Sequence, residues 1–194
     1  ETMCEGVEHT AGAYYYFCMP QFLHLFLSRK RLEPEGVPTG ISNAINVKLS
    51  GIKTYDEFYK YFTDSLKLAI GTGAELNRNI GEEYPRINPC PLFSASLSGC
   101  IENARDYKSG GAKYNLSGIT LIGLGDIVNS LIAIKHLVFE SHLLSLEELR
   151  KIIDSNWENN ELLRMQAQSL PRYGHGIEEG DIIATRFASE IAAY

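Results

Sequence analysis

Apolar residues recur every three or four positions over much of this chain, which is the spacing of an amphipathic helix. The clearest stripes lie in residues 55–69, 127–138 and 146–153, and another runs through residues 183–191. Each stripe predicts a helix that buries one face against a core. The longer apolar run over residues 11–27 favours a buried core helix as well.

Polar residues mark where these helices begin. Thr54 and Glu57 have the spacing of a capping box, in which each side chain satisfies a free backbone amide at the start of a helix, and Ser145 and Glu148 repeat that spacing. Asp126 is expected to cap the helix between them, because a short acidic side chain accepts hydrogen bonds from the first turn.

Extended segments are fewer. Residues 45–49 alternate apolar and polar side chains as a half-buried strand does, while residues 112–116 and 119–124 are short apolar runs. Strands this short need neighbours to close a sheet. The whole pattern therefore predicts a helix-rich α/β fold.

Residues 91–118 predict a helix, a sharp break and then a strand. Gly110 and Gly111 are expected to end the helix, because glycine adopts positive φ without steric cost. The apolar face of the predicted helix consists of Phe93, Leu97, Cys100, Ile101 and Ala104.

The composition is that of an ordinary globular protein, with 194 residues, 44% of them hydrophobic and 22% charged. The net charge of -6 argues against a nucleic-acid partner, which needs a clustered basic surface. The basic residues 29–31 are interpreted as the end of a helix, where cations face the negative end of the dipole.

Residues 11–27 are also the only candidate for a membrane span, but they contain Pro20, Gln21 and His24 and fall short of the roughly 20 apolar residues that a span needs. No secretory leader is recognisable, so we expect a cytoplasmic protein without a membrane partner. Four cysteines without a Cys-x-x-Cys pair predict reduced thiols, and the five histidines lack an i, i+4 pair, so no metal site is predicted.

Three segments stand out in order along the chain. They are Gly99-Cys-Ile-Glu-x-x-Arg-Asp106, Gly110-Gly-Ala-Lys-Tyr-Asn115 and Asp126-x-x-x-Ser-Leu-x-Ala-Ile-Lys-x-x-Val-Phe139. Together they resemble the pyruvate formate-lyase-like glycyl radical enzymes. The resemblance implies that residues 1–194 form a single partial domain, which is part of the family's ten-stranded α/β barrel from the cysteine loop onward.

The same resemblance implies that the glycyl radical domain of the family is not present in this chain. We therefore expect either a natural short form or an excised piece of a longer protein, and we expect the piece to be inactive by itself. In the full-length protein, a glycyl radical passes to a cysteine sulfur, and the thiyl radical abstracts hydrogen from a small-molecule substrate.

The implied reaction cleaves a C–C or C–heteroatom bond, as formate acetyltransferases, dehydratases and lyases do under anaerobic conditions. The resemblance implies no bound cofactor, a radical S-adenosylmethionine activating enzyme that installs the radical, and a homodimer when the protein is full length. The alternative is a catalytically degenerate paralogue or fragment that serves as a non-enzymatic binding or scaffold piece.

The family's Gly-Cys-x-Glu loop should fall well upstream of the three segments, where Cys4 lies. Two registers remain open. Either Cys4 is the radical cysteine with Glu5 out of step, or Gly6-Val-Glu8 overlays Cys-x-Glu and the cysteine has been lost. The catalytic base of the family then corresponds to Glu8 or to Glu5. His9 lies beside this loop and is a candidate substrate-binding residue.

Cys100 and Glu102 also spell Gly-Cys-x-Glu, but Cys100 lies on the predicted apolar helix face, which favours a packing role. Asn115 follows the double glycine, where the family's corner lies near the barrel interior. Its amide either holds the backbone of that corner or contacts substrate.

Overall fold

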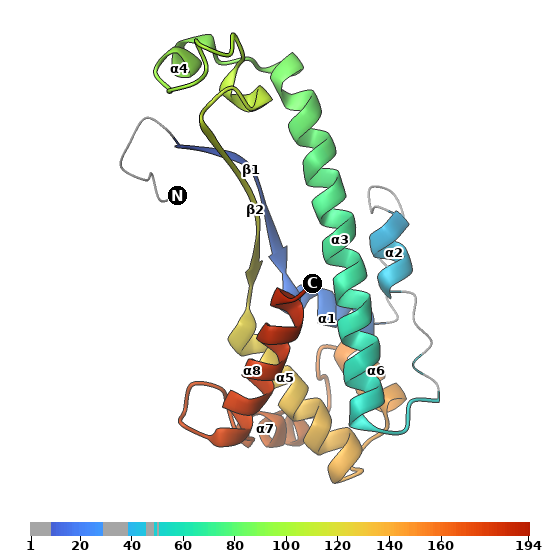
Figure 1. Cartoon of the computed structure of the whole chain (residues 1–194). Helices are drawn as coiled ribbons and strands as arrows, with labels where there is room; N and C mark the ends of the chain where they lie inside the picture. Colours follow the sequence, from blue (N-terminus) through green and yellow to red (C-terminus); the bar gives the residue numbers. More distant parts are fainter. Residues whose placement is uncertain (1–8, 29–38, 46–48, 50) are drawn as a thin grey trace. The chain divides into compact units, whose positions relative to one another are not determined.

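The computed structural model describes residues 9–28, 39–45, 49 and 51–194. Within them helices predominate, as the sequence predicts (Figure 1). The elements in chain order are β1 (His9–Cys18), α1 (Met19–Leu27), α2 (Thr39–Ile45), α3 (Tyr55–Ile87), α4 (Pro91–Ala95), the 3-10 turn η1 (Tyr107–Ser109), β2 (Tyr114–Ile122), α5 (Leu124–Ile134), the π-helical turn η2 (Lys135–Glu140), α6 (Leu146–Asp154), α7 (Glu161–Ser169) and α8 (Glu178–Ala192).

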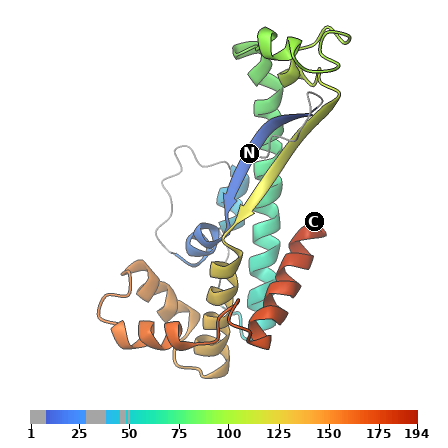
Figure 2. The same ribbon diagram turned by 90° about the vertical axis from the view of Figure 1, so that its left-hand side faces the viewer.

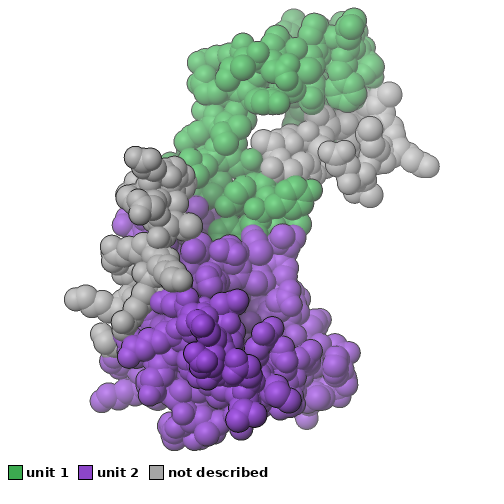
Figure 3. Space-filling model, turned by 180° about the vertical axis from the view of Figure 1, so that it is seen from behind, with its two compact units in different colours: residues 1–17, 71–120 green, residues 18–70, 121–194 purple. Residues whose placement is uncertain are grey.

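The chain divides into two compact units, which Figure 3 colours separately. Unit 1 consists of residues 1–17 and 71–120, and unit 2 of residues 18–70 and 121–194. The long helix α3 begins in unit 2 and ends in unit 1. The single partial domain expected over residues 1–194 stays a prediction.

Unit 1 contains a two-stranded sheet of β1 and β2. Their arrows point the same way in Figures 1 and 2, so the pair is parallel. The C-terminal part of α3 lies against β1, because a Cβ atom at Gly73 would lie 2.6 Å from the ring of Tyr15. Glycine at this position therefore lets an aromatic strand residue contact the helix backbone.

The core of unit 2 is an aromatic cluster from α1, α3 and α8. The ring centroid of Phe62 lies 5.5 Å from that of Phe26, 6.5 Å from that of Phe58 and 6.4 Å from that of Phe187. Each of the four side chains is at most 1% exposed. Rings of this size carry much of the apolar area that a core buries, so the cluster holds the three helices together.

The predicted helix starts are confirmed at both capping boxes. The Glu57 amide donates to Thr54 Oγ1 at 3.2 Å while the Thr54 amide donates to the Glu57 carboxylate, and Ser145 and Glu148 form the same reciprocal pair. The prediction for Asp126 is wrong. Helix α5 begins two residues earlier, with Gly123 at the N-cap, and Asp126 lies in its first turn.

The apolar face predicted for α5 and η2 is confirmed, because Ile127, Leu131, Ile134 and Val138 are all buried. The helix begins directly after β2, where Gly123 has φ 91°. A Cβ atom at that position would lie 2.5 Å from the ring of Pro20. Glycine therefore meets two requirements here, a left-handed backbone and close packing against the start of α1.

Three predicted segments differ from the structure. Residues 11–27 are not one buried helix but most of β1 followed by α1. The strand predicted over residues 45–49 is wrong at its first position, since Ile45 ends helix α2, and residues 46–48 lie outside the described residues. The two runs predicted at 112–116 and 119–124 overlap the single strand β2 (Tyr114–Ile122), and Leu124 already belongs to α5. The basic residues 29–31 also lie outside the described part of the chain.

The helix predicted from Phe93 onward is largely wrong. Helix α4 ends at Ala95, and hydrogen-bonded turns follow it. Leu97 and Cys100 are buried as expected, but Phe93 is 47% exposed and Ile101 69% exposed. Gly99 has φ 97°, which an α-helix does not allow, so the apolar spacing here belongs to a series of turns.

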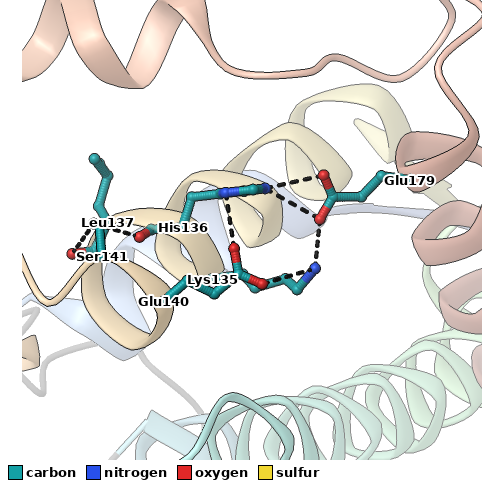
Figure 4. A network of polar contacts seen from close by, with 6 residues as sticks. All are labelled: Lys135, His136, Leu137, Glu140, Ser141 and Glu179. Atoms are coloured by element: carbon teal, nitrogen blue, oxygen red, sulfur yellow. Dashed lines mark hydrogen bonds and ion pairs between the residues drawn. The ribbon is translucent and has the colours of Figure 1, made fainter.

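A network of ion pairs in unit 2 joins η2 to α8 (Figure 4). The ring of His136 lies between two carboxylates, with Nδ1 2.9 Å from Glu140 and Nε2 2.9 Å from Glu179. The Lys135 ammonium contacts the same two residues, at 3.2 Å and 2.5 Å respectively. A π-helical turn closes bonds between residues five apart, so Glu140 reaches both Lys135 and His136.

Removal of the Glu179 charge is expected to reduce the acid sensitivity of unit 2. Burial acts to raise the pKa of Glu179, but hydrogen bonds from Lys135 and His136 outweigh it and hold this pKa below its usual value. A carboxyl group with a lowered folded-state pKa stabilises the fold above its unfolded-state pKa, and this contribution is lost as the pH falls through the folded-state pKa. Glu179→Gln should therefore lower the free energy of unfolding by roughly 1 kcal/mol near neutral pH and very little near pH 3.

Urea unfolding of the variant at the two pH values measures this difference. Glu178→Gln is the matched control, because Glu178 is an exposed acidic residue of the same first helical turn. Equal losses in the two variants at neutral pH would show that the network contributes nothing beyond the helix dipole.

Candidate functional site

The first residues of β1 and β2 form one edge of the parallel pair, which we call the strand-start edge (His9 and Tyr114). Parallel strands that pair side by side begin at the same side of their sheet. His9 opens β1, and its side chain lies outside the described part of the structure. The predicted catalytic residues Cys4, Glu5 and Glu8 also lie outside the described residues and directly precede this strand in the sequence.

Asn115 lies at the same edge, as the second residue of β2. Its side-chain amide donates to the carbonyl oxygen of Ala112 at 2.7 Å. This bond supports the interpretation that Asn115 holds the backbone at the start of the strand, and substrate contact by Asn115 stays a prediction. The Lys113 ammonium lies 5.3 Å from the ring centre of Tyr114, so a positive charge is present at this edge.

Two pieces of backbone cross closely just before β2 begins. We call this crossing the glycine corner (residues 99–111). A Cβ atom at Gly111 would lie 2.1 Å from the carbonyl oxygen of Arg105, and one at Gly99 would lie 2.8 Å from the amide nitrogen of Lys113. Real Cβ atoms do not approach other atoms so closely. Only glycine at both positions lets these two pieces of backbone cross.

Asp106 connects the glycine corner to the preceding helix. Its carboxylate accepts from the Cys90 amide at 2.7 Å, the Ser94 hydroxyl at 2.9 Å and the Lys108 amide at 2.9 Å. Burial acts to raise the pKa of Asp106, but these hydrogen bonds outweigh it and lower the pKa. The charged carboxylate is therefore the form that holds α4 against η1.

The polar residues of the Gly-Cys-Ile-Glu segment also bind backbone atoms. Glu102 accepts from the Gly99 amide at 2.9 Å, and Asn103 donates to the carbonyl oxygen of Gly111 at 3.0 Å. Arg105 donates to the carbonyl oxygen of Ser109. The segment that carries much of the family resemblance thus stabilises the turn that begins β2.

Cys100 is a packing residue, as the sequence predicts. It is 3% exposed and lies in a small cluster with Leu97 and Ala112, against which Tyr107 packs. Burial raises the pKa of its thiol, which keeps the sulfur protonated. A protonated thiol is a poor nucleophile, and the burial of Cys100 among apolar side chains fits a packing role.

The sequence analysis missed the role of Ser94 and Lys108. The Ser94 hydroxyl donates to Asp106 and accepts from the Tyr107 amide at 3.0 Å, while Lys108 donates to the carbonyl oxygen of Asn88 at 2.9 Å. The detectable signal was the Asp106-x-Lys108 spacing, because an aspartate commonly accepts from the amide two residues later. The contact to Ser94 joins residues 12 apart and leaves no comparable local pattern.

No group of three histidine, cysteine or acidic side chains in residues 9–28, 39–45, 49 and 51–194 is arranged to hold a metal ion. No helix in the same residues combines the length and the hydropathy that a bilayer span requires.

Comparison with known proteins gives consistent matches. A family model described as pyruvate formate lyase-like matches residues 1–194. Trans-4-hydroxy-L-proline dehydratase of Clostridioides difficile is 32% identical over 194 residues, which cover 94% of this chain and 23% of that protein. Isethionate sulfite-lyase of Desulfovibrio desulfuricans is 30% identical over 134 residues, which cover 67% of this chain and 16% of that protein.

Solved structures have the same fold. The glycerol dehydratase of Clostridium butyricum superposes with a TM-score of 0.79 at 22% identity, over 97% of this chain and 24% of that one. Hydroxyproline dehydratase of Clostridioides difficile, with trans-4-hydroxy-L-proline bound, gives a TM-score of 0.71 at 29% identity over 92% of this chain and 23% of that one. The predicted fold class is confirmed, and the matched part of the chain spans a quarter or less of the length of each of these relatives.

Gly111→Ala is expected to unfold the glycine corner locally or to destabilise it strongly. The added methyl group would meet the backbone of Arg105, which cannot rotate away as a flexible side chain can. We expect the free energy of unfolding to fall by about 1–3 kcal/mol or more. Urea denaturation followed by circular dichroism measures the change.

Gly81→Ala is the matched control, because a Cβ atom at this position in α3 would meet nothing within 4 Å. It should raise the free energy of unfolding by up to about 1 kcal/mol, since alanine is the better helix former. An equal loss of stability in the two variants would contradict the steric explanation.

Proposed function

This chain belongs to the pyruvate formate lyase-like family, and from that premise we propose that it is the part of a glycyl radical enzyme that contains the radical-carrying cysteine loop. We propose further that the full-length enzyme eliminates a leaving group from a small hydroxylated metabolite. The observation that carries this proposal is the 32% identity over 94% of the chain to a dehydratase.

The names of the relatives narrow the reaction class. A dehydratase removes water and a sulfite-lyase releases sulfite, so both break a bond between carbon and a heteroatom. Among the C–C and C–heteroatom reactions that the family resemblance implies, elimination at a C–O or C–S bond is therefore the best supported. The substrate would be a small polar molecule with a leaving group next to a C–H bond.

The proposed reaction has three steps. The cysteine thiyl radical takes one hydrogen atom from the substrate carbon, which forms an S–H bond and leaves a carbon radical. A glutamate carboxylate takes a proton from the substrate and returns it to the leaving hydroxyl group, so that the C–O bond breaks and water departs. The product radical then recovers a hydrogen atom from the thiol, which restores the thiyl radical.

The chain's own residues would divide these roles between the loop and the strand-start edge. Cys4 is the proposed hydrogen-abstracting residue, and Glu8 or Glu5 the proposed base. The loop leads directly into His9 at the start of β1, and Asn115 is the second residue of β2, the strand that pairs with β1. This order of residues supports His9 and Asn115 as groups near the substrate. The Asn115 side chain also holds the backbone, through its hydrogen bond to the Ala112 carbonyl.

The partners of the full-length protein belong to the same proposal. A radical S-adenosylmethionine activating enzyme would install a glycyl radical in the part of the protein outside this segment. That radical supplies the oxidising equivalent that makes the thiyl radical. The full-length protein would act as a homodimer in the cytoplasm.

The test is an anaerobic electron paramagnetic resonance and turnover experiment on the full-length protein after treatment with the activating enzyme and S-adenosylmethionine. Trans-4-hydroxy-L-proline, isethionate and glycerol are suitable substrates, since relatives act on molecules of these kinds. We expect a glycyl doublet in the wild type and in Cys4→Ala, with turnover lost only in Cys4→Ala. Cys100→Ala is the control and should retain turnover, because Cys100 is a buried packing residue.

The two registers of the loop give different outcomes. Turnover that does not depend on Cys4 would exclude Cys4 as the thiyl carrier. If the wild type is inactive and Gly6→Cys gains turnover, the second register is correct. The wild-type protein is then the catalytically degenerate alternative. A doublet that never forms with a competent activating enzyme would reject the radical-enzyme proposal itself.

A further inference from the structure

The connection between α6 and α7 has an unusual backbone. Helix α6 ends in a Schellman motif, in which the Trp157 amide donates to the Ile152 carbonyl at 2.9 Å and the Asn156 amide to the Ile153 carbonyl at 2.9 Å. That motif requires one left-handed residue, and Asn156, with φ 53°, supplies it. Asparagine is a common substitute for glycine at this position.

Trp157 is left-handed as well, with φ 64°, although the motif does not require it. A bulky residue at positive φ is an outlier, since its Cβ atom crowds the following carbonyl oxygen. Trp157 is also the only tryptophan in the chain. Retained strain of this kind is commonly found at ligand sites.

Trp157 lines a cavity of about 230 Å³ in unit 2. The walls come from α1, α5, η2, α6 and α7, and they are mostly aliphatic, with Leu23 and Leu27 from α1 and Leu149 and Ile153 from α6. Two polar side chains, His24 and Ser130, also line the cavity. The Ser130 hydroxyl donates to the Asp126 carbonyl, so it faces a ligand as an acceptor.

We propose that this cavity is a binding site for a neutral, single-ring apolar molecule, which stacks or packs against Trp157. The proposal goes beyond the radical chemistry above and rests on residues of unit 2 alone. An apolar cavity of roughly 150 Å³ accepts benzene, so a cavity of this size has room for one substituted ring. A neutral ligand fits best, because His24 is the only ionisable side chain among the lining residues and an unpaired charge is costly to remove from water.

Bromobenzene is a suitable probe, since its heavy atom quenches tryptophan fluorescence on contact and Trp157 is the only such reporter. We expect quenching of this chain to saturate with probe concentration. The charged analogue 4-bromobenzoate should quench weakly and without saturation. Linear, collision-like quenching by both probes would overturn the proposal.

Filling variants locate the binding. Ala133→Phe places a ring in the cavity from α5, and Ala167→Leu fills it from α7, so one variant remains informative where the other fails to fold. Either should weaken the apparent affinity for bromobenzene by roughly tenfold or more. Ala188→Phe, on the exposed face of α8, is the matched control and should bind as the wild type does. Unchanged affinity in a folded filling variant would place the probe elsewhere and reject the site.

Discussion

The backbone crossing at the glycine corner determines where the sheet of unit 1 begins. Gly99 and Gly111 leave no room for a Cβ atom, and the Lys113 amide donates to the Ser98 carbonyl at 2.8 Å directly across the crossing. This bond fixes the chain one residue before β2 starts at Tyr114. The position of the strand-start edge, and with it the candidate site, therefore depends on a steric constraint that only glycine satisfies.

The sequence predicted those parts of the fold that are encoded by neighbours within four residues. Both capping boxes, and the apolar stripes of α3 and α5, form as expected because their contacts are local. The helix predicted from Phe93 onward did not form, because tertiary contacts with Ala112 and Tyr107 bury Leu97 and Cys100 without a helical backbone. The strand β1 was missed for a related reason, since a continuous apolar run does not distinguish a buried strand from a helix.

The candidate site could be predicted only in part, because the residues that carry the family resemblance have a structural role. Glu102 and Asp106 accept hydrogen bonds from backbone amides in and next to the glycine corner. The motif that indicates the family therefore consists of residues that stabilise the fold. The proposed role of Cys4 rests instead on its position in the chain, upstream of β1. The structure shows that the Asn115 side-chain amide donates to the Ala112 carbonyl. The sequence left open whether this amide holds the backbone or contacts substrate.

Both units contain glycines in left-handed backbone, where positive φ carries little cost. Examples are Gly99 and Gly110 in unit 1 and Gly123 in unit 2. In unit 2 Trp157 takes this conformation, at a cost of roughly 1–2 kcal/mol for a residue with a Cβ atom. Glycine at this position would form the same turn with less strain, so the indole must recover the cost through its contacts. The aliphatic walls of the cavity supply part of that recovery, and a ring bound beside the indole would supply more, which is the physical reason to expect a ligand there.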